Sequence, residues 1–260
     1  MSLIKSAADQ QRMRKAGHLL AAVLDAAVET AVPGVVLREL DLFIAKCINE
    51  GGAKPSFLGH EGYPASSCLS VNDAVVHGIP DGYVLKEGDI LGIDAGLWLD
   101  GVCSDSAITV AIGNPAALSE DQQKLLTTTF SALKKGVAQV KPFRRVGVIS
   151  STVQAVAESE DLGIVRGLTG HGVGHAVWED PEVPNHGLPG SGAILRPGMC
   201  IAIEPMFTLG SGTTVTDIDG WTVRSAEGLA AAQYEYTVLI TERGVENLTP
   251  WKVPAYLQPN

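Results

Sequence analysis

Hydrophobic positions near the start of the chain recur with the period of a helix. Between residues 7 and 31, apolar side chains stand three or four positions apart, and Val32-Pro33-Gly34 follows them. This spacing predicts an amphipathic helix that ends before the proline. The same period over 37–50, followed by Gly51-Gly52, predicts a second helix. Residues 55–80 are rich in Gly, Pro, Ser and Asn and favour binding loops.

Residues 88–110 change to the pattern of a β-hairpin. Two apolar runs flank Asp100-Gly101, a dipeptide that accepts the positive φ angles of a two-residue turn. Counting outward from this turn places Asp94 and Asp105 on one face as diagonal neighbours, roughly 7–8 Å apart at the backbone. Two carboxylates among apolar neighbours need a cation or a shared proton. The hairpin thus indicates a metal-binding pair, and a solvated hairpin with acidic residues is the alternative.

The order of predicted elements repeats in the second half. A capping box at Ser119 and Gln122 begins a helix to about residue 140, and another helix is predicted over 147–160. The stretch Leu85–Asp94 also aligns in register with Leu195–Glu204, so that Leu, a basic residue, Gly, Ile and an acid recur. Such a repeat favours an ancient duplication.

We therefore predict an α/β (α+β) fold with two pseudosymmetric halves, about 1–115 and 116–260. Each half is expected to pack two helices on antiparallel strands, within a single domain over residues 1–260.

Composition narrows the class of protein. With 260 residues, 45% hydrophobic and 18% charged, the chain is typical of a globular protein. A net charge of −10 argues against binding of nucleic acid. The N-terminal residues lack the apolar run of a signal peptide, and no stretch approaches the length of a membrane span, so we expect a cytoplasmic protein that is not membrane-bound. The four cysteines form no close pair, which argues against a zinc knuckle or a disulfide framework.

Three further residues join the acidic pair as candidate ligands. Glu204 and Glu235 each lie in an apolar strand-like stretch. Burial of an ionised carboxyl group there costs free energy unless a partner compensates its charge. For Glu204, a structural salt bridge is the alternative. His171 is flanked by glycines that permit a close approach of the backbone. We take His171 as a ligand and His175 as structural or peripheral.

Several motifs occur in order along the chain. They are Ser-Val-Asn-Asp-Ala-Val-Val-His-Gly-Ile-Pro over 70–80, Ile-Asp at 93–94 with Asp105 eleven residues after Asp94, Gly-His-Gly-Val-Gly over 170–174, Ile-Glu-Pro-Met over 203–206, and Tyr-Glu at 234–235. On these motifs nearly the whole chain resembles the type I methionine aminopeptidases, which are metallopeptidases of the pita-bread fold. The resemblance implies a single catalytic domain of that fold that removes the initiator methionine from nascent proteins.

The resemblance also implies a dinuclear metal site. Asp105 and Glu235 would bridge two divalent ions, Asp94 would chelate one ion, and His171 and Glu204 would complete the other. A set of four carboxylates and one imidazole suits Co, Mn, Fe or Zn. The family's mechanism implies that a hydroxide held between the ions attacks the scissile carbonyl.

Further roles follow from the same resemblance. Glu204 would shuttle the proton and His77 would stabilise the developing charge; a solvated loop histidine is the alternative for His77. The methionine pocket maps onto Phe57, His60, Tyr63, Cys68 and Trp221, with Val177 close by. His60 and Val177 stand where aromatic residues are frequent in relatives, which weakens a strict preference for methionine. For Trp221, ordinary packing is the alternative.

Trp178 departs from the family pattern, because the motif leads one to expect a substrate-contacting histidine at this position. An indole N–H donates a hydrogen bond but neither accepts one nor carries a proton. We expect hydrolysis to survive, at a lower rate.

Two alternatives remain at this stage. An Xaa-Pro aminopeptidase or prolidase shares the five ligands, and a catalytically weakened peptide-binding relative would explain Trp178. If the first assignment holds, the partners are nascent chains with an N-terminal methionine, met transiently at the ribosome, and the protein is a monomer.

Overall fold

The computed structural model describes residues 3–258, so residues 1–2 and 259–260 of the predicted domain lie outside it. Helices and antiparallel strands are mixed, which confirms the predicted α/β (α+β) class. The helices are α1 (Ala7–Thr30), α2 (Leu37–Glu50), α3 (Glu120–Ala138) and α4 (Gly147–Glu158), with short 3-10 turns η1 (His60–Gly62), η2 (Pro115–Ala117) and η3 (Ala255–Leu257). These bounds agree closely with the predicted helices. The capping box at Ser119 and Gln122 is present in full.

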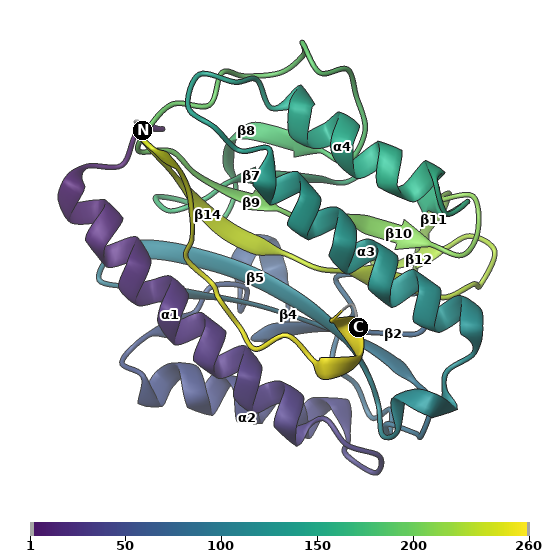
Figure 1. The fold of residues 1–260 in the computed structure, drawn as a ribbon. Helices are drawn as coiled ribbons and strands as arrows, with labels where there is room; N and C mark the ends of the chain where they lie inside the picture. The colour runs from purple at the N-terminus through teal and green to yellow at the C-terminus, as the bar shows by residue number, and fades with distance from the viewer. Residues whose placement is uncertain (1–2, 259–260) are drawn as a thin grey trace.

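The predicted hairpin forms the centre of the first sheet. Strands β4 (Ile90–Leu99) and β5 (Val102–Ala111) pair antiparallel, with Leu99 opposite Val102. Asp100 and Gly101 have φ of 50° and 82°, the left-handed values that a two-residue turn of this kind requires. Strands β1 (Lys54–Pro55) and β2 (Ser67–Val71) also pair with β4. Helices α1 and α2 pack on this sheet (Figure 1).

The second half is built on a five-stranded sheet of order β15-β14-β9-β7-β8. Its strands are β7 (Thr169–Gly172), β8 (Glu179–Pro184), β9 (Cys200–Ile203), β14 (Tyr236–Thr241) and β15 (Gly244–Asn247). Helices α3 and α4 pack against each other and cover this half (Figure 1). Each half therefore has its own pair of helices, as predicted.

Two three-stranded sheets complete the fold. One has the order β13-β10-β6, with β6 (Gly163–Ile164), β10 (Met206–Thr208) and β13 (Ala231–Gln233). The other has the order β11-β12-β3, with β3 (Ala74–Val76), β11 (Thr214–Thr216) and β12 (Val223–Ser225). The second of these joins residues from both halves, since β3 and β12 are far apart in the sequence.

One strand differs from the prediction. The stretch around Glu235 was expected to be continuous, but it is divided into β13 and β14, with Tyr234 and Glu235 between them. The physical reason is that β13 pairs with β10 whereas β14 pairs with β9, so the chain passes from one sheet to another. The same break occurs on the partner strands, where Glu204-Pro205 separates β9 from β10.

The hydrophobic core is shared between the halves. Helix α1 buries the stripe predicted from its sequence, including Met13, Leu20 and Leu24, each 0% exposed. The same core cluster contains residues of α3 and of β9 and β14. Continuous burial of this kind fixes the two sheets relative to each other, which the site between them requires.

Candidate metal centre and substrate pocket

The hairpin brings its two acids to one face. Asp94 pairs with Ala107 and Asp105 with Gly96, so the two carboxylates are the diagonal neighbours that the sequence predicted. Both line one cavity. Asp94 is 8% exposed and Asp105 3%, which excludes the alternative of a solvated hairpin.

The second half supplies the other three candidate ligands. His171 lies on β7, Glu204 directly after β9, and Glu235 between β13 and β14. The two glutamates sit where strands change partners, at positions where the backbone turns out of one sheet and into the next. All five predicted residues line the same cavity, which also contains Gln233.

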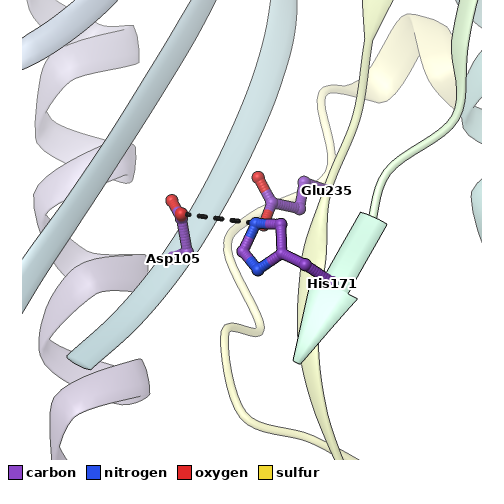
Figure 2. A group of neighbouring side chains, drawn as sticks. All are labelled: Asp105, His171 and Glu235. Carbon is purple, nitrogen blue, oxygen red and sulfur yellow. Dashed lines mark ion pairs between the residues drawn. The ribbon is translucent and has the colours of Figure 1, made fainter. Parts of the chain in front are cut away.

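His171 faces the acids at short range. Its Nε2 lies 3.9 Å from Asp105 Oδ2 and 3.6 Å from Glu204 Oε1. Figure 2 marks the contact between His171 and Asp105 with a dashed line. Asp105, His171 and Glu235 each offer a ligand atom within 4.8 Å of the others. The His171 Nδ1 lies 2.9 Å from the Gly172 carbonyl oxygen, and since a carbonyl only accepts, Nδ1 carries the proton. The lone pair of Nε2 is thereby directed toward the carboxylates.

The local fold explains how His171 reaches this position. A Cβ at Gly172 would collide with the carbonyl oxygen of Asp180, and one at Gly170 with that of Ala202. The glycines on both sides of the histidine therefore allow β7 to pack closely between β8 and β9. This is the close approach predicted from the sequence.

Burial makes the cavity unfavourable for the charges it contains. Burial raises the pKa of Asp94 to about 7, and burial together with neighbouring carboxylates raises the pKa of Asp105 and of Glu235 well above their usual range. Glu204 shifts in the same direction through burial and the charge of Asp94. Burial also lowers the pKa of His171 to about 4, so its imidazole is neutral near pH 7.

The donor set fits divalent cations. Within residues 3–258, Asp94 Oδ1, Asp105 Oδ1 and Glu235 Oε1 are buried without a hydrogen-bond partner. Buried carboxylate oxygens of this kind need a cation or a proton. Four carboxylates and a neutral imidazole are the ligands that such ions as Mn²⁺, Fe²⁺, Co²⁺ and Zn²⁺ accept.

A network of buried hydroxyls joins the two halves beside the site. Thr237 on β14 donates to the Asp105 carbonyl at 2.6 Å, and Ser106 on β5 donates to the Glu235 carbonyl at 2.7 Å. The Glu235 amide donates to Ala107 O at 2.8 Å. Strands of different sheets are thus held side by side at Asp105 and Glu235. Ser106 is a positioning residue that the sequence does not reveal, because a buried serine next to an acid carries no distinctive pattern.

Gln233 was also missed as a site residue. Its Nε2 donates to Glu204 Oε2 at 3.2 Å, and its side chain is 4% exposed. The signal in the sequence is its position two residues before Glu235, which places both side chains on one face of a strand. This hydrogen bond orients the Glu204 carboxylate, which leaves the other oxygen toward His171.

An aromatic pocket adjoins the acids in the same cavity. The predicted pocket residues that line it are Phe57, His60, Tyr63, Cys68 and Trp221. Cys68 lies directly opposite Asp94 in the β2–β4 pair, which places the pocket next to the candidate ligands. The Tyr63 and Trp221 rings meet edge to face at 5.2 Å. Val177 is instead buried in the hydrophobic core at 2% exposure.

His77 and Trp178 lie at the opening of the cavity. Both also line the adjoining cleft, together with His171 and Glu204. His77 has φ of 58°, and burial lowers its pKa. Trp178 is 43% exposed.

The loop that carries Trp178 is held in place by an ion pair and by hydrogen bonds to Glu179. The side chain of Lys5 is 0% exposed and forms an ion pair of 2.5 Å with Glu179. Glu179 also accepts hydrogen bonds from the backbone N–H groups of His175 and Ala176. His175 itself lies 3.5 Å from Asp9 of α1, in the peripheral place predicted for it.

Comparison with known proteins agrees with this geometry. A sequence profile of metallopeptidase family M24 matches residues 11–242. The chain is 44% identical over 249 residues to a methionine aminopeptidase of Clostridium perfringens. The alignment covers 96% of this chain and 99% of that protein.

Solved structures give the same result. The crystal structure of the methionine aminopeptidase of Thermotoga maritima superposes with a TM-score of 0.92 at 38% identity, covering 95% of this chain and 98% of that one. A prolidase of Pyrococcus furiosus has the same fold, with a TM-score of 0.78 at 24% identity, and this chain spans 66% of its length. The predicted pita-bread fold is confirmed. The chain therefore belongs to metallopeptidase family M24 and, within it, to the type I methionine aminopeptidases.

Proposed function

We propose that this protein is a metal-dependent aminopeptidase that removes the initiator methionine from nascent polypeptides by hydrolysis. The observation that carries the proposal is a single cavity lined by all five candidate ligands and by an aromatic pocket. Such a cavity holds the amino end of a peptide beside the reacting groups. Membership of family M24 supports the use of divalent metal.

The metal ligands in this proposal are Asp94, Asp105, His171, Glu204 and Glu235. The chain holds two ions of Co, Mn, Fe or Zn, which when bound supply an activated water and polarise the scissile carbonyl. The support from this structure is that Asp94, Asp105 and Glu235 each have a buried carboxylate oxygen without a hydrogen-bond partner among residues 3–258. The imidazole of His171 is neutral near pH 7 and does not compensate their charge. Asp105 and Glu235 would hold the ions from opposite halves of the fold, together with His171.

Glu204 and His77 are the proposed catalytic residues. Glu204 takes a proton from the attacking water at Oε1 and returns it to the leaving amine, while Gln233 holds Oε2. His77 is half-buried, and burial lowers its pKa, so its neutral imidazole donates a hydrogen bond to the scissile amide group as charge develops.

The aromatic pocket binds the first side chain of the substrate. Phe57, Tyr63, Cys68 and Trp221 provide apolar walls, and His60 provides a polar group. Tyr63 is fixed by contacts of its hydroxyl with the carbonyls of Gly78 at 2.9 Å and Ser67 at 3.1 Å. Trp178 at the opening contacts the peptide beyond the first residue and donates through its indole N–H.

Hydrolysis of defined peptides tests the proposal. Purified protein is assayed on Met-Ala-Ser and Ala-Pro-Ala, each with and without added Mn²⁺ or Co²⁺. The proposal predicts metal-dependent release of methionine from Met-Ala-Ser. Preferential cleavage of Ala-Pro-Ala would support a prolidase-like enzyme, and no release from either peptide would support a peptide-binding relative.

The cellular setting is part of the same proposal. We infer that the protein acts in the cytoplasm as a monomer, on chains emerging at the ribosome, without binding nucleic acid or membrane. No helix within residues 3–258 combines the length and the apolar character needed to cross a bilayer. The net charge of −10 supports the absence of a nucleic-acid partner.

A further inference from the structure

His60 stands on a rigid turn at the edge of the pocket. Its amide donates to Phe57 O at 2.9 Å, and the Tyr63 amide donates to His60 O at 2.8 Å. The turn is bounded by Gly59 and Gly62, whose φ values of 81° and 92° are left-handed. A backbone fixed in this way holds the imidazole in place against the cavity.

The His60 ring packs against Trp178, which comes from a different part of the chain. The two ring centroids are 4.9 Å apart, with an angle of 74° between the ring planes. Trp178 lines both the inner cavity and the outer cleft, whereas His60 lines the inner cavity. Trp178 therefore closes the pocket on the side of His60, and the imidazole lies among the groups that meet the first side chain of a substrate.

One polar atom of this imidazole is unsatisfied. Within residues 3–258, His60 Nε2 is buried without a hydrogen-bond partner. The Tyr63 hydroxyl, which also lies in the pocket wall, already contacts two backbone carbonyls. Burial raises the pKa of the Cys68 thiol, which stays neutral and is only a weak donor. A ligand atom that pairs with the imidazole recovers an interaction that the apolar walls do not provide.

We propose that His60 extends the range of this pocket beyond methionine, so that first residues of the same length with a hydrogen-bonding group near the end of the side chain are preferred over purely apolar ones. Methionine sulfoxide and glutamine are members of this class. The inference rests on the proposed function, because it assigns the pocket to the first residue of a peptide. The thioether of methionine is a weak acceptor and leaves the imidazole poorly paired, whereas a sulfoxide or amide oxygen accepts from it fully. A pocket with a buried polar group discriminates against an apolar side chain such as that of norleucine, which leaves the group unpaired.

The test compares polar and apolar first residues of equal length. We measure kcat/KM for peptides X-Ala-Ser in which X is methionine sulfoxide, glutamine or norleucine, together with methionine itself. The polar-to-norleucine ratio is expected to fall at least about tenfold in His60→Phe, the equivalent of one hydrogen bond. His60→Gln keeps a hydrogen-bonding amide and is expected to keep most of the preference. His18→Phe, an exposed substitution on α1, is the matched control and leaves the ratio unchanged.

A binding measurement separates this inference from the proposed activity. The affinities of free L-methionine sulfoxide and L-norleucine for the metal-loaded protein are followed by tryptophan fluorescence, since Trp178 and Trp221 line the cavity. If no peptide is hydrolysed, the proposed function fails, yet the ratio of the two affinities still decides the role of His60. An affinity ratio that is the same in wild type and His60→Phe overturns the inference, as does a lack of binding of both amino acids. Loss of the preference in His60→Phe and its retention in His60→Gln support it.

Discussion

The Thr237 hydroxyl donates a 2.6 Å hydrogen bond to the backbone carbonyl of Asp105 and so links a strand of the five-stranded sheet to the hairpin. The Asp105 amide lies 3.4 Å from the same hydroxyl, so both backbone groups of the acid meet this one side chain. Thr237 is 0% exposed and lies two positions after Glu235. The contact sets the separation of two proposed ligands from opposite halves, without itself touching metal or substrate.

Replacement of Thr237 by Val tests this positioning role. The shape of the side chain is kept, whereas the hydrogen bond to Asp105 is lost. We expect the affinity for Mn²⁺ or Co²⁺ to fall about tenfold or more, the size of effect seen when outer groups that orient metal ligands are removed. Isothermal titration calorimetry measures it. Thr241→Val on the same strand, which loses local bonds to Gly244 O and from the Arg243 amide, serves as the control. Equal affinities in both variants would show that the hydroxyl does not position the site.

Trp178→His tests the residue that departs from the family pattern. A histidine can accept and carry a proton, which an indole cannot. We expect kcat/KM on Met-Ala-Ser to rise about tenfold, the equivalent of one additional hydrogen bond. Trp178→Phe lacks both functions and should not raise the rate. An unchanged or lower kcat/KM in Trp178→His would refute the idea that Trp178 limits catalysis.

His77→Asn tests the stabilisation of developing charge. Asparagine tolerates the left-handed backbone at this position, where φ is 58°, so the substitution removes the imidazole without adding backbone strain. We expect kcat/KM to fall about 10²–10³-fold, while the affinity for metal stays unchanged. Steady-state kinetics and calorimetry on the same sample separate the two effects. A matching loss of metal affinity would mean that His77 acts on the metal site instead.

Removal of metal should destabilise the protein more as the pH rises. The pKa of Asp94 is raised to about 7 by burial, and those of Asp105, Glu204 and Glu235 are raised well above their usual range by burial and by neighbouring carboxylates. In the unfolded chain these carboxyl groups have their ordinary pKa values, about 4. Between about pH 4 and pH 7 and above, the folded protein without metal therefore binds more protons than the unfolded chain, so its stability falls as the pH increases.

Thermal melts with EDTA and with Mn²⁺ check this dependence. Bound cations compensate the carboxylate charges, so the difference in Tm between the two conditions should widen from pH 5 to pH 8. Taking the difference at each pH cancels the contribution of groups elsewhere in the protein. A gap that is constant or narrows toward pH 8 would contradict the assignment of these acids to a metal site.

The local parts of this fold were predictable from the sequence. The register of β4 and β5 followed from Asp100-Gly101, because a two-residue turn fixes every pair beyond it. Helix bounds followed from apolar spacing and from capping residues such as Ser119. In each case the signal lies within a short stretch of chain.

Contacts between distant segments were not predictable in the same way. The break at Glu235 depends on which sheets β13 and β14 join, and a single strand pattern does not specify its partners. The contact of His60 with Trp178 and the bond from Ser106 to Glu235 likewise arise only when the two halves pack together. Periodicity in the sequence indicates which face is buried, but it does not identify the neighbour.

The central claim is that Asp94, Asp105, His171, Glu204 and Glu235 jointly hold two divalent ions that support removal of methionine. Titration of metal-depleted protein with Mn²⁺ or Co²⁺, with ions bound per chain and hydrolysis of Met-Ala-Ser followed in the same samples, tests it most directly. The account predicts two ions per chain and activity that rises with metal occupancy, and loss of both in Asp105→Asn. Failure to bind divalent metal, or wild-type stoichiometry and activity in Asp105→Asn, would contradict it.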